Sequence, residues 1–262
     1  MATVTDPGRR HKLPDKPVAL VTGTNKGIGL QIARDLAGHG FTVLVGARDL
    51  ERGRKAAQTV GADARAVQLD VTDQASIAAA AKYIREELGR LDVLVNNAGI
   101  GHAGEPGRSL KEIAESGRPS IASLDEVRAV FETNVFGVIA VTQAMLPLLR
   151  EAPAARIVNV SSGSGSLAMN ADPDNPRRAM FGAVYSPSKT ALNAITLAFA
   201  VELEPTGIKV NAAAPGFTAT DFNNFEGTRT VQQAAREPVR LALLGPDGPT
   251  GTFSDEDGPV PW

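Results

Sequence analysis

The residues with the clearest chemical purpose in this 262-residue chain are Ser162, Tyr185 and Lys189. Tyr185 and Lys189 are four positions apart where a helix is expected to begin, so their side chains share one helix face. A free tyrosine has a pKa of about 10, and a neighbouring ammonium group favours the phenolate. The pattern therefore predicts a tyrosine whose pKa is lowered by Lys189 and which acts as a general acid toward a carbonyl oxygen.

A glycine-rich turn at residues 22–29, Thr-Gly-Thr-Asn-Lys-Gly-Ile-Gly, lies between an apolar run and a helical pattern. Such a turn lets the backbone approach a pyrophosphate, and the N-terminus of the following helix faces the negative charge. A tight turn without a ligand is the alternative, because the spacing differs from the commoner G-x-G-x-x-G. The residues predicted to form this dinucleotide site are Gly23, Asn25, Lys26, Gly27, Ile28 and Gly29.

The end of the second apolar run indicates which dinucleotide is bound. Folds that prefer NAD carry an acidic residue there, about 20 residues after the glycines. This chain instead has Arg48, and Asp49 is interpreted as the N-cap of the next helix. A guanidinium group binds phosphate through two hydrogen bonds, and Lys26 could approach the same group. The segment predicts NADP(H) rather than NAD(H), with a solvated surface arginine as the alternative.

The elements that must position these groups alternate along the chain. Buried runs rich in Val, Leu and Ile indicate strands covered on both faces, as in a parallel sheet. Strands are expected at 17–22, 41–45, 64–69, 91–95, 156–160, 208–212 and 251–253. Helices are expected at 28–38, 49–60, 73–88, 124–150 with a bend near Gly137 and Pro147, 184–203 and 230–244.

This alternation predicts an α/β fold, a Rossmann-type doubly wound parallel sheet with helices on both faces. We expect a single domain over residues 17–262 and a flexible N-terminal arm over residues 1–16. Three polar segments follow strands, at the sheet edge where open α/β folds bind ligands, and are expected to form inserts or lids. They cover residues 101–123, 163–183 and 217–230.

Several residues of these segments allow two interpretations. His102 is interpreted as a loop residue with no role in the chemistry, and a place in the substrate pocket is the alternative. Phe181, Phe217 and Phe222 could form pocket walls or only pack a lid. Asp70, after the third strand, could hold the edge of an adenine or cap a helix.

Composition excludes several classes of protein. The 27 basic and 29 acidic side chains give a net charge of −2, which disfavours a nucleic-acid binder that relies on bulk charge. The absence of cysteine excludes a disulfide scaffold and a cysteine-ligated metal, and three histidines do not suggest a metal site. The N-terminus is polar, and the apolar stretch 191–203 is interrupted by polar residues. We therefore expect no membrane partner and a cytoplasmic location.

Five motifs in order identify a resemblance. They are Thr22-Gly-x-x-x-Gly-x-Gly29, Asn96-Asn-Ala-Gly99, Ser162-x-x-Gly165, Tyr185-x-x-x-Lys189 and Pro215-Gly216. From about Val18 to its C-terminus the chain resembles a short-chain dehydrogenase/reductase. The sequence around its motifs is most similar to the NADPH-dependent carbonyl reductase branch.

The resemblance implies a role for each matching residue. Tyr185 would be the proton donor and acceptor, Lys189 would hold the nicotinamide ribose, and Ser162 would hydrogen-bond the substrate oxygen. Asn134 would complete this set by holding a water molecule in a proton relay. Besides the glycine turn, the implied cofactor contacts are Arg48, Asp70, Val71, Asn97, Ala98, Gly99, Tyr185, Lys189, Pro215, Gly216, Thr218 and Thr220.

The resemblance also implies a reaction. An NADP(H)-dependent enzyme of this kind transfers a hydride to a ketone or aldehyde, reversibly, and needs no metal. Its partner would be a small-molecule carbonyl substrate. Twenty-three positions separate Ser162 from Tyr185, and this insert lies near a surface that many members use for dimerisation, so both monomer and homodimer stay open. A non-enzymatic NADP-binding sensor or partner protein, and a dehydratase or epimerase, are the alternatives.

Overall fold

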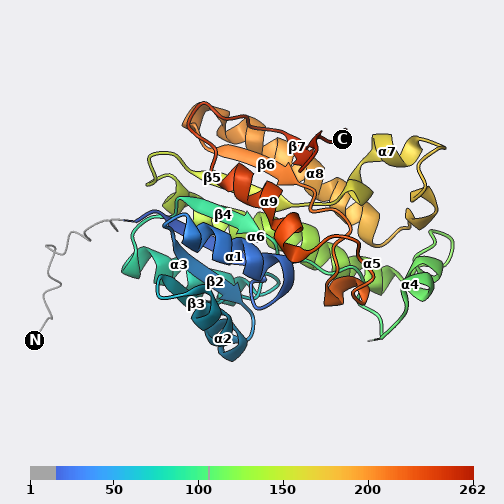
Figure 1. The fold of residues 1–262 in the computed structure, drawn as a ribbon, viewed down its shortest axis with the longest axis horizontal. Coiled ribbons are helices and arrows are strands. Elements are labelled where there is room, and N and C mark those ends of the chain that lie inside the picture. Colours follow the sequence, from blue (N-terminus) through green and yellow to red (C-terminus); the bar gives the residue numbers. More distant parts are fainter. Residues whose placement is uncertain (1–15, 106) are drawn as a thin grey trace, which may run out of the picture.

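A computed structural model describes residues 16–105 and 107–262 of the chain. It shows one eight-stranded sheet with helices on both faces (Figure 1). The strand order is β3-β2-β1-β4-β5-β6-β7-β8, and all neighbouring strands are parallel except β7 and β8. The strands are β1 Val18–Thr22, β2 Thr42–Ala47, β3 Ala64–Gln68, β4 Val93–Asn96, β5 Arg156–Val160, β6 Lys209–Ala213, β7 Phe253–Asp255 and β8 Gly258–Pro259.

The helices connect these strands in the predicted alternation. The α-helices are α1 Gly27–Gly38, α2 Leu50–Val60, α3 Gln74–Glu87, α4 Leu110–Ser116, α5 Leu124–Phe131, α6 Gly137–Leu149, α7 Leu167–Ala171, α8 Tyr185–Leu203 and α9 Val231–Ala242. A π-helical turn, η1 Glu132–Phe136, joins α5 to α6. Short 3-10 turns are η2 Gly163–Gly165, η3 Arg178–Met180, η4 Glu204–Thr206 and η5 Asp221–Asn223.

Two apolar cores lie on opposite faces of the sheet. Successive side chains of a strand point to opposite faces. Val18 and Leu20 of β1 accordingly pack with residues of α3, α6 and α8, whereas Ala19 and Val21 pack with residues of α1 and α9. All four side chains are fully buried. The prediction of a doubly wound sheet buried on both faces is therefore confirmed.

The predicted helix over residues 124–150 is interrupted rather than merely bent. The π-turn Glu132–Phe136 lies at its centre and ends next to Gly137, whose added Cβ would lie 2.8 Å from the Val71 carbonyl oxygen. Single π-turns inside α-helices are often found at functional sites. This turn carries Asn134, which is fully buried.

The described residues contain one helical stretch, Leu124–Leu149, that is both long and strongly apolar. By length and composition alone it could cross a membrane, with a mean hydropathy of 1.4 over its most apolar window. Half of that window is buried inside the protein. A core helix of a globular protein meets the same criterion, so the stretch is weak support for a membrane span.

The structure differs from the sequence prediction at the inserts and the ends. The segment 101–123 contains helix α4, and 163–183 contains α7; Figure 1 shows α4, α5 and α7 gathered at one end of the molecule. The antiparallel strand β8 was not predicted. Lys16, placed in the predicted arm, forms an ion pair with Asp63 at 2.8 Å. The rest of that arm, residues 1–15, lies outside the described residues.

Candidate active site

Ser162 and Tyr185 meet where β5 ends and α8 begins. Ser162 caps the turn η2, and its Oγ accepts a hydrogen bond from the Ser164 amide at 3.1 Å. The Ser162 side chain lies close enough to the Tyr185 phenol to oppose part of the rise in pKa that burial causes. The structure thus brings together two residues that are separated by the 163–183 insert in the sequence.

The loop that carries Ser162 is tied directly to α8. The Ser161 hydroxyl donates to Asn193 Oδ1 at 2.5 Å. A Cβ added to Gly165 would lie 2.7 Å from the main-chain carbonyl carbon of Lys189, so only glycine permits this close approach. Sequence reasoning did not single out Ser161 or Asn193, because neither residue type suggests a role without the tertiary contact.

Lys189 lies one turn along α8 and is 5% exposed. Its Nζ donates to the Val160 carbonyl oxygen at 2.8 Å and lies 5.8 Å from the centre of the Tyr185 ring. Burial lowers the pKa of Lys189 to about 8. The predicted juxtaposition of Tyr185 and Lys189 on one helix face is confirmed.

In the protein without its cofactor the pKa of Tyr185 is raised, whereas the expected lowering depended on Lys189 together with an oxidised nicotinamide ring. Burial raises the pKa of Tyr185 to about 12, and Ser162 only partly opposes that rise. Loss of solvation of the phenolate is thus the larger of the two effects on the pKa of Tyr185. Tyr185 is protonated at neutral pH and available as an acid.

Asn134 is held rigidly by three hydrogen bonds. Its Oδ1 accepts from the Ile100 amide at 2.9 Å, and its Nδ2 donates to the Ile100 carbonyl at 2.9 Å and to Ser188 Oγ at 3.0 Å. Ser188 in turn donates to the Tyr185 carbonyl oxygen at 2.6 Å. Ser188 is thus a link between Asn134 and the first turn of α8, and sequence reasoning missed it despite its position three residues after Tyr185.

Gly99 marks the place where Asn134 and Lys189 converge. A Cβ added there would lie 3.2 Å from Asn134 Oδ1 and 3.6 Å from Lys189 Nζ. Glycine leaves that space open between an amide oxygen and an ammonium group. The four residues predicted to act together, Ser162, Tyr185, Lys189 and Asn134, therefore adjoin one another.

The glycine turn has the geometry of a phosphate cradle. Gly23 and Gly27 have φ of +66° and +60°, a conformation that residues with a Cβ rarely adopt. A Cβ added to Gly29 would lie 2.7 Å from the Gly23 carbonyl oxygen. Asn25 and Ile28, also predicted here, are partly exposed in the same turn.

The N-terminus of α1 is available for an anion. No described side chain caps it, and its first turn has no acidic residue. By contrast, Asp49 caps α2 and Asp73 caps α3. The free amide groups and the helix dipole of α1 favour a negatively charged group, so the turn has the features needed to hold the pyrophosphate of a dinucleotide.

Lys26 and Thr220 connect this turn to the segment after β6. Lys26 forms an ion pair with Asp221. The Thr220 methyl group lies 3.7 Å from the place that a Cβ on Gly27 would take. Lys26, predicted to face a 2′-phosphate, is thus engaged by a carboxylate that sequence reasoning did not identify.

Arg48 and Asp70 follow strands β2 and β3 in the structure. Arg48 is exposed directly after β2, and Asp49 caps α2 by accepting from the Arg52 amide at 3.0 Å, as predicted. Asp70 is partly buried and accepts from Thr72, through the amide at 3.0 Å and the hydroxyl at 2.8 Å. Because Asp73 is the cap of α3, the helix-cap alternative for Asp70 is wrong.

The turn after β4 is bonded to the end of β1. The amides of Asn97 and Ala98 both donate to Thr22 Oγ1 at 3.0 Å. The Asn97 side chain also donates to the carbonyls of Thr22 at 2.8 Å and Gly23 at 3.1 Å. Asn97 thus shapes the glycine turn through its side chain.

The turn after β6 is also tightly packed. Gly216 has φ +77°, and an added Cβ would lie 2.5 Å from Arg229 Cδ. The Thr218 hydroxyl donates to the Gly216 and Pro215 carbonyls at 3.2 Å and 3.4 Å.

The three insert segments meet over the catalytic residues. The Phe222 ring contacts the Tyr185 ring edge to face, with centroids 5.4 Å apart. Asn224 Nδ2 donates to the Arg108 carbonyl oxygen at 3.0 Å, and the Arg177 guanidinium lies 5.4 Å from the Phe217 ring centre. Phe222 therefore borders the candidate site, whereas Phe217 contacts Arg177 of the 163–183 segment.

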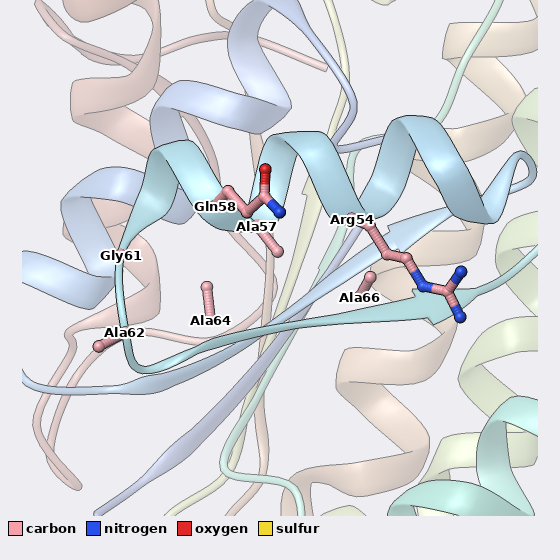
Figure 2. Close-up of a pocket in the computed structure, with 7 residues that line it drawn as sticks. All are labelled: Arg54, Ala57, Gln58, Gly61, Ala62, Ala64 and Ala66. Atoms are coloured by element: carbon pink, nitrogen blue, oxygen red, sulfur yellow. The ribbon is translucent and has the colours of Figure 1, made fainter.

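A separate open depression lies between α2 and β3. It is lined by Arg54, Ala57, Gln58, Gly61, Ala62, Ala64 and Ala66 (Figure 2). β3 is at the edge of the sheet, and three strands, β2, β1 and β4, lie between it and β5. None of the catalytic candidates contributes to this lining.

Comparison with known proteins agrees with this geometry. Residues 17–230 match the family model described as short chain dehydrogenase. The short-chain dehydrogenase anuI of Penicillium roqueforti is 38% identical, over 88% of this chain and 90% of its own length. Salutaridine reductase from Papaver somniferum has a similar structure, with a TM-score of 0.76, 30% identity and coverage of 91% of this chain and 99% of its own.

A third similar protein is a 3-ketoacyl-(acyl-carrier-protein) reductase from Brucella melitensis, solved in complex with NADH. It has a TM-score of 0.74 and 26% identity, and the alignment covers 92% of this chain and 96% of its own. Proteins of this family use nicotinamide cofactors. By its fold, its matched length and its relatives, the chain belongs to the short chain dehydrogenase family of oxidoreductases.

Proposed function

We propose that this protein is an NADP(H)-dependent reductase of ketones or aldehydes, which also oxidises secondary alcohols in reverse. The convergence of Ser162, Tyr185, Lys189 and Asn134 beside an uncapped helix N-terminus carries the proposal. The dinucleotide supplies the hydride and the protein orients and polarises the carbonyl group. A non-enzymatic sensor would have no use for the complete set.

Each residue has a definite task in this reaction. The Ser162 hydroxyl binds the carbonyl oxygen, and the Tyr185 phenol donates its proton to that oxygen. The phenolate left behind is stabilised by the Lys189 ammonium group, 5.8 Å from the ring centre. Asn134 orients the first turn of α8 through Ser188. Lys189 is also expected to bind the ribose of the cofactor.

The test replaces the proton donor and keeps its ring. We expect Tyr185→Phe to lower kcat by about a hundredfold or more, because general acid catalysis contributes on this scale, and to leave NADPH binding intact. NADPH consumption would be followed with aldehydes, quinones, ketoesters and cyclic ketones. Tyr83→Phe is the matched control, since Tyr83 packs against the core beyond the site.

The outcomes separate the candidate functions. NADPH binding without turnover of any substrate by the unchanged protein would favour the sensor. Turnover that survives in Tyr185→Phe would contradict the assigned role. A tightly held cofactor with product formed and no net NADPH consumption would indicate a dehydratase or epimerase.

The preference for NADPH is assigned to Arg48. Its guanidinium would pair with the 2′-phosphate, and one charge-assisted hydrogen bond contributes about 1.5–3 kcal/mol. We therefore expect Arg48→Ala to lower kcat/KM for NADPH by about ten- to a hundredfold and to change the value for NADH little. Arg54→Ala is the control, because Arg54 is paired with Glu51 on α2. Equal losses with both cofactors would refute the assignment.

A further inference from the structure

An ion pair joins the glycine turn to the segment after β6. Lys26 is the N-cap residue of α1, and its ammonium group pairs with the Asp221 carboxylate. The two residues are 195 positions apart in the chain, so only the folded protein brings them together. Next to this pair, the Thr220 methyl group lies 3.7 Å from the place that a Cβ on Gly27 would take. Asp221 is therefore held beside the turn that is proposed to receive the dinucleotide.

Asp221 brings a negative charge to a helix end that has none of its own. The first turn of α1 contains no acidic residue, and no described side chain caps it. The N-terminus of a helix favours negative charge within its first turn. A separate loop thus supplies, in the free protein, an anion at the end of α1 where the phosphates of a dinucleotide are expected.

The two cations predicted for the 2′-phosphate differ in their surroundings. None of the ion pairs formed by residues 16–105 and 107–262 involves Arg48, whereas Lys26 is paired with Asp221. A carboxylate and a phosphate compete for one ammonium group, because both accept hydrogen bonds from its N–H donors. An incoming phosphate therefore meets one cation that is ready and one that must first leave its partner.

The exposure of the pair makes this exchange of partners feasible. The side chains of Lys26 and Asp221 are 61% and 45% exposed. Exposed ion pairs are weak, because water and salt screen the two charges. A phosphate monoester carries up to two negative charges, against one for a carboxylate. The phosphate is therefore the stronger partner for Lys26.

We propose that Asp221 holds Lys26 in the free protein and that the 2′-phosphate of NADP(H) displaces this carboxylate. Asp221 is then a residue that determines cofactor specificity. It weakens the binding of NADPH, and it leaves the binding of NADH unchanged, because NADH has no 2′-phosphate. The inference rests on the proposed preference for NADP(H) and adds a residue that opposes it. Asp221 takes no part in hydride or proton transfer.

The first test measures cofactor binding to the full-length protein without substrate. We expect Asp221→Asn to lower the Kd of NADPH by about two- to fivefold, the value of one exposed ion pair. The Kd of NADH should not change. Both constants come from titrations followed by the fluorescence of the reduced nicotinamide. Glu226→Gln is the matched control, since Glu226 is exposed on the same segment and the variant loses the same charge.

A double variant separates competition from simple repulsion. Lys26→Met removes the shared cation, so adding Asp221→Asn to it should change the Kd of NADPH no further. Repulsion between Asp221 and the phosphate would instead give the same gain with or without Lys26. Calorimetric titrations with 2′,5′-ADP and 5′-AMP repeat the comparison. These ligands have no nicotinamide, so the result does not depend on catalysis.

The outcomes are distinct from those that test the reductase. A gain for NADPH and 2′,5′-ADP that requires Lys26 supports the proposal, whatever the turnover. An unchanged or higher Kd of NADPH in Asp221→Asn, an equal gain with NADH, an equal gain in Glu226→Gln, or a gain that persists in Lys26→Met would each overturn it. Failure of the unchanged protein to bind either dinucleotide would overturn the proposed cofactor as well. Tight NADPH binding without turnover bears only on the reductase proposal.

Discussion

At the scale of single residues, burial decides the properties of Tyr185 and Lys189. It raises the pKa of the phenol to about 12 and lowers that of the ammonium to about 8. Both shifts favour the neutral form, since desolvation penalises charge. A charged or polar ligand is therefore needed to stabilise the phenolate form of Tyr185 in this buried site. This agrees with a reaction that occurs only once the cofactor is bound.

A pH-dependent stability difference follows from the Lys189 shift. Its pKa is lower in the folded protein than the ordinary value of 10.5. Between pH 8 and 10 the unfolded chain still holds a proton that the folded chain has released, so this group adds stability as the pH rises. Below pH 8 both states are protonated and the contribution is constant. The rise in Tyr185 pKa acts only above about pH 10, outside this window.

The measurement compares the unchanged protein with Lys189→Met, which has no titrating group at that position. Urea unfolding without cofactor at pH 7, 8, 9 and 10 gives the free energy of unfolding of each. The free energy of unfolding of the unchanged protein should increase relative to that of Lys189→Met as the pH rises from 8 to 10. A constant difference, or one that moves the other way, would show that folding does not lower the pKa of Lys189.

At the scale of elements, the turn between β1 and α1 is tightly constrained. Gly29 packs against the Gly23 carbonyl and the Asn97 side chain. By contrast, a Cβ on Gly38, at the other end of α1, would meet nothing within 4 Å. Packing therefore requires glycine at position 29, whereas position 38 has room for a side chain.

Alanine at these two positions should have opposite effects. Gly29→Ala forces the turn apart, and we expect a loss of about 1–3 kcal/mol of folding stability, typical of overpacking, together with weakened NADPH binding. Gly38→Ala should gain about 0.5–1 kcal/mol by reducing the freedom of the unfolded chain. Denaturant unfolding and NADPH titration of both variants check this. Normal cofactor affinity in a folded Gly29→Ala variant would contradict the assignment of the turn.

At the scale of the whole molecule, segments far apart in sequence close around the site. Lys26 of the glycine turn pairs with Asp221, and Asn224 reaches the Arg108 carbonyl. The Trp262 ring stacks on Phe253 with centroids 5.4 Å apart, and its carbonyl accepts from the Ala168 amide at 3.0 Å. The insert after β5 is therefore supported by the C-terminal residue and β7.

Removal of the Trp262 ring should loosen this support. We expect Trp262→Ala to cost about 1 kcal/mol for the aromatic pair, which corresponds to a fall in Tm of about 2–4 °C in a chain of this size. Amide exchange over residues 166–171 should become faster. Ile121→Ala is the control, since Ile121 is 67% exposed. Unchanged exchange in the insert would show that the tail does not hold it.

The sequence by itself determined the features that depend on local spacing. Tyr185 and Lys189 share a helix face because four residues make about one turn, and buried Val and Leu runs predict the sheet. Only the tertiary structure decided the contacts between distant segments. The bonds from Asn134 to Ile100 and Ser188, the Lys26–Asp221 pair and the Phe222–Tyr185 contact each depend on how loops pack. The direction of the Tyr185 pKa shift belongs to the same class, because burial is a property of the packed molecule and no local pattern encodes it.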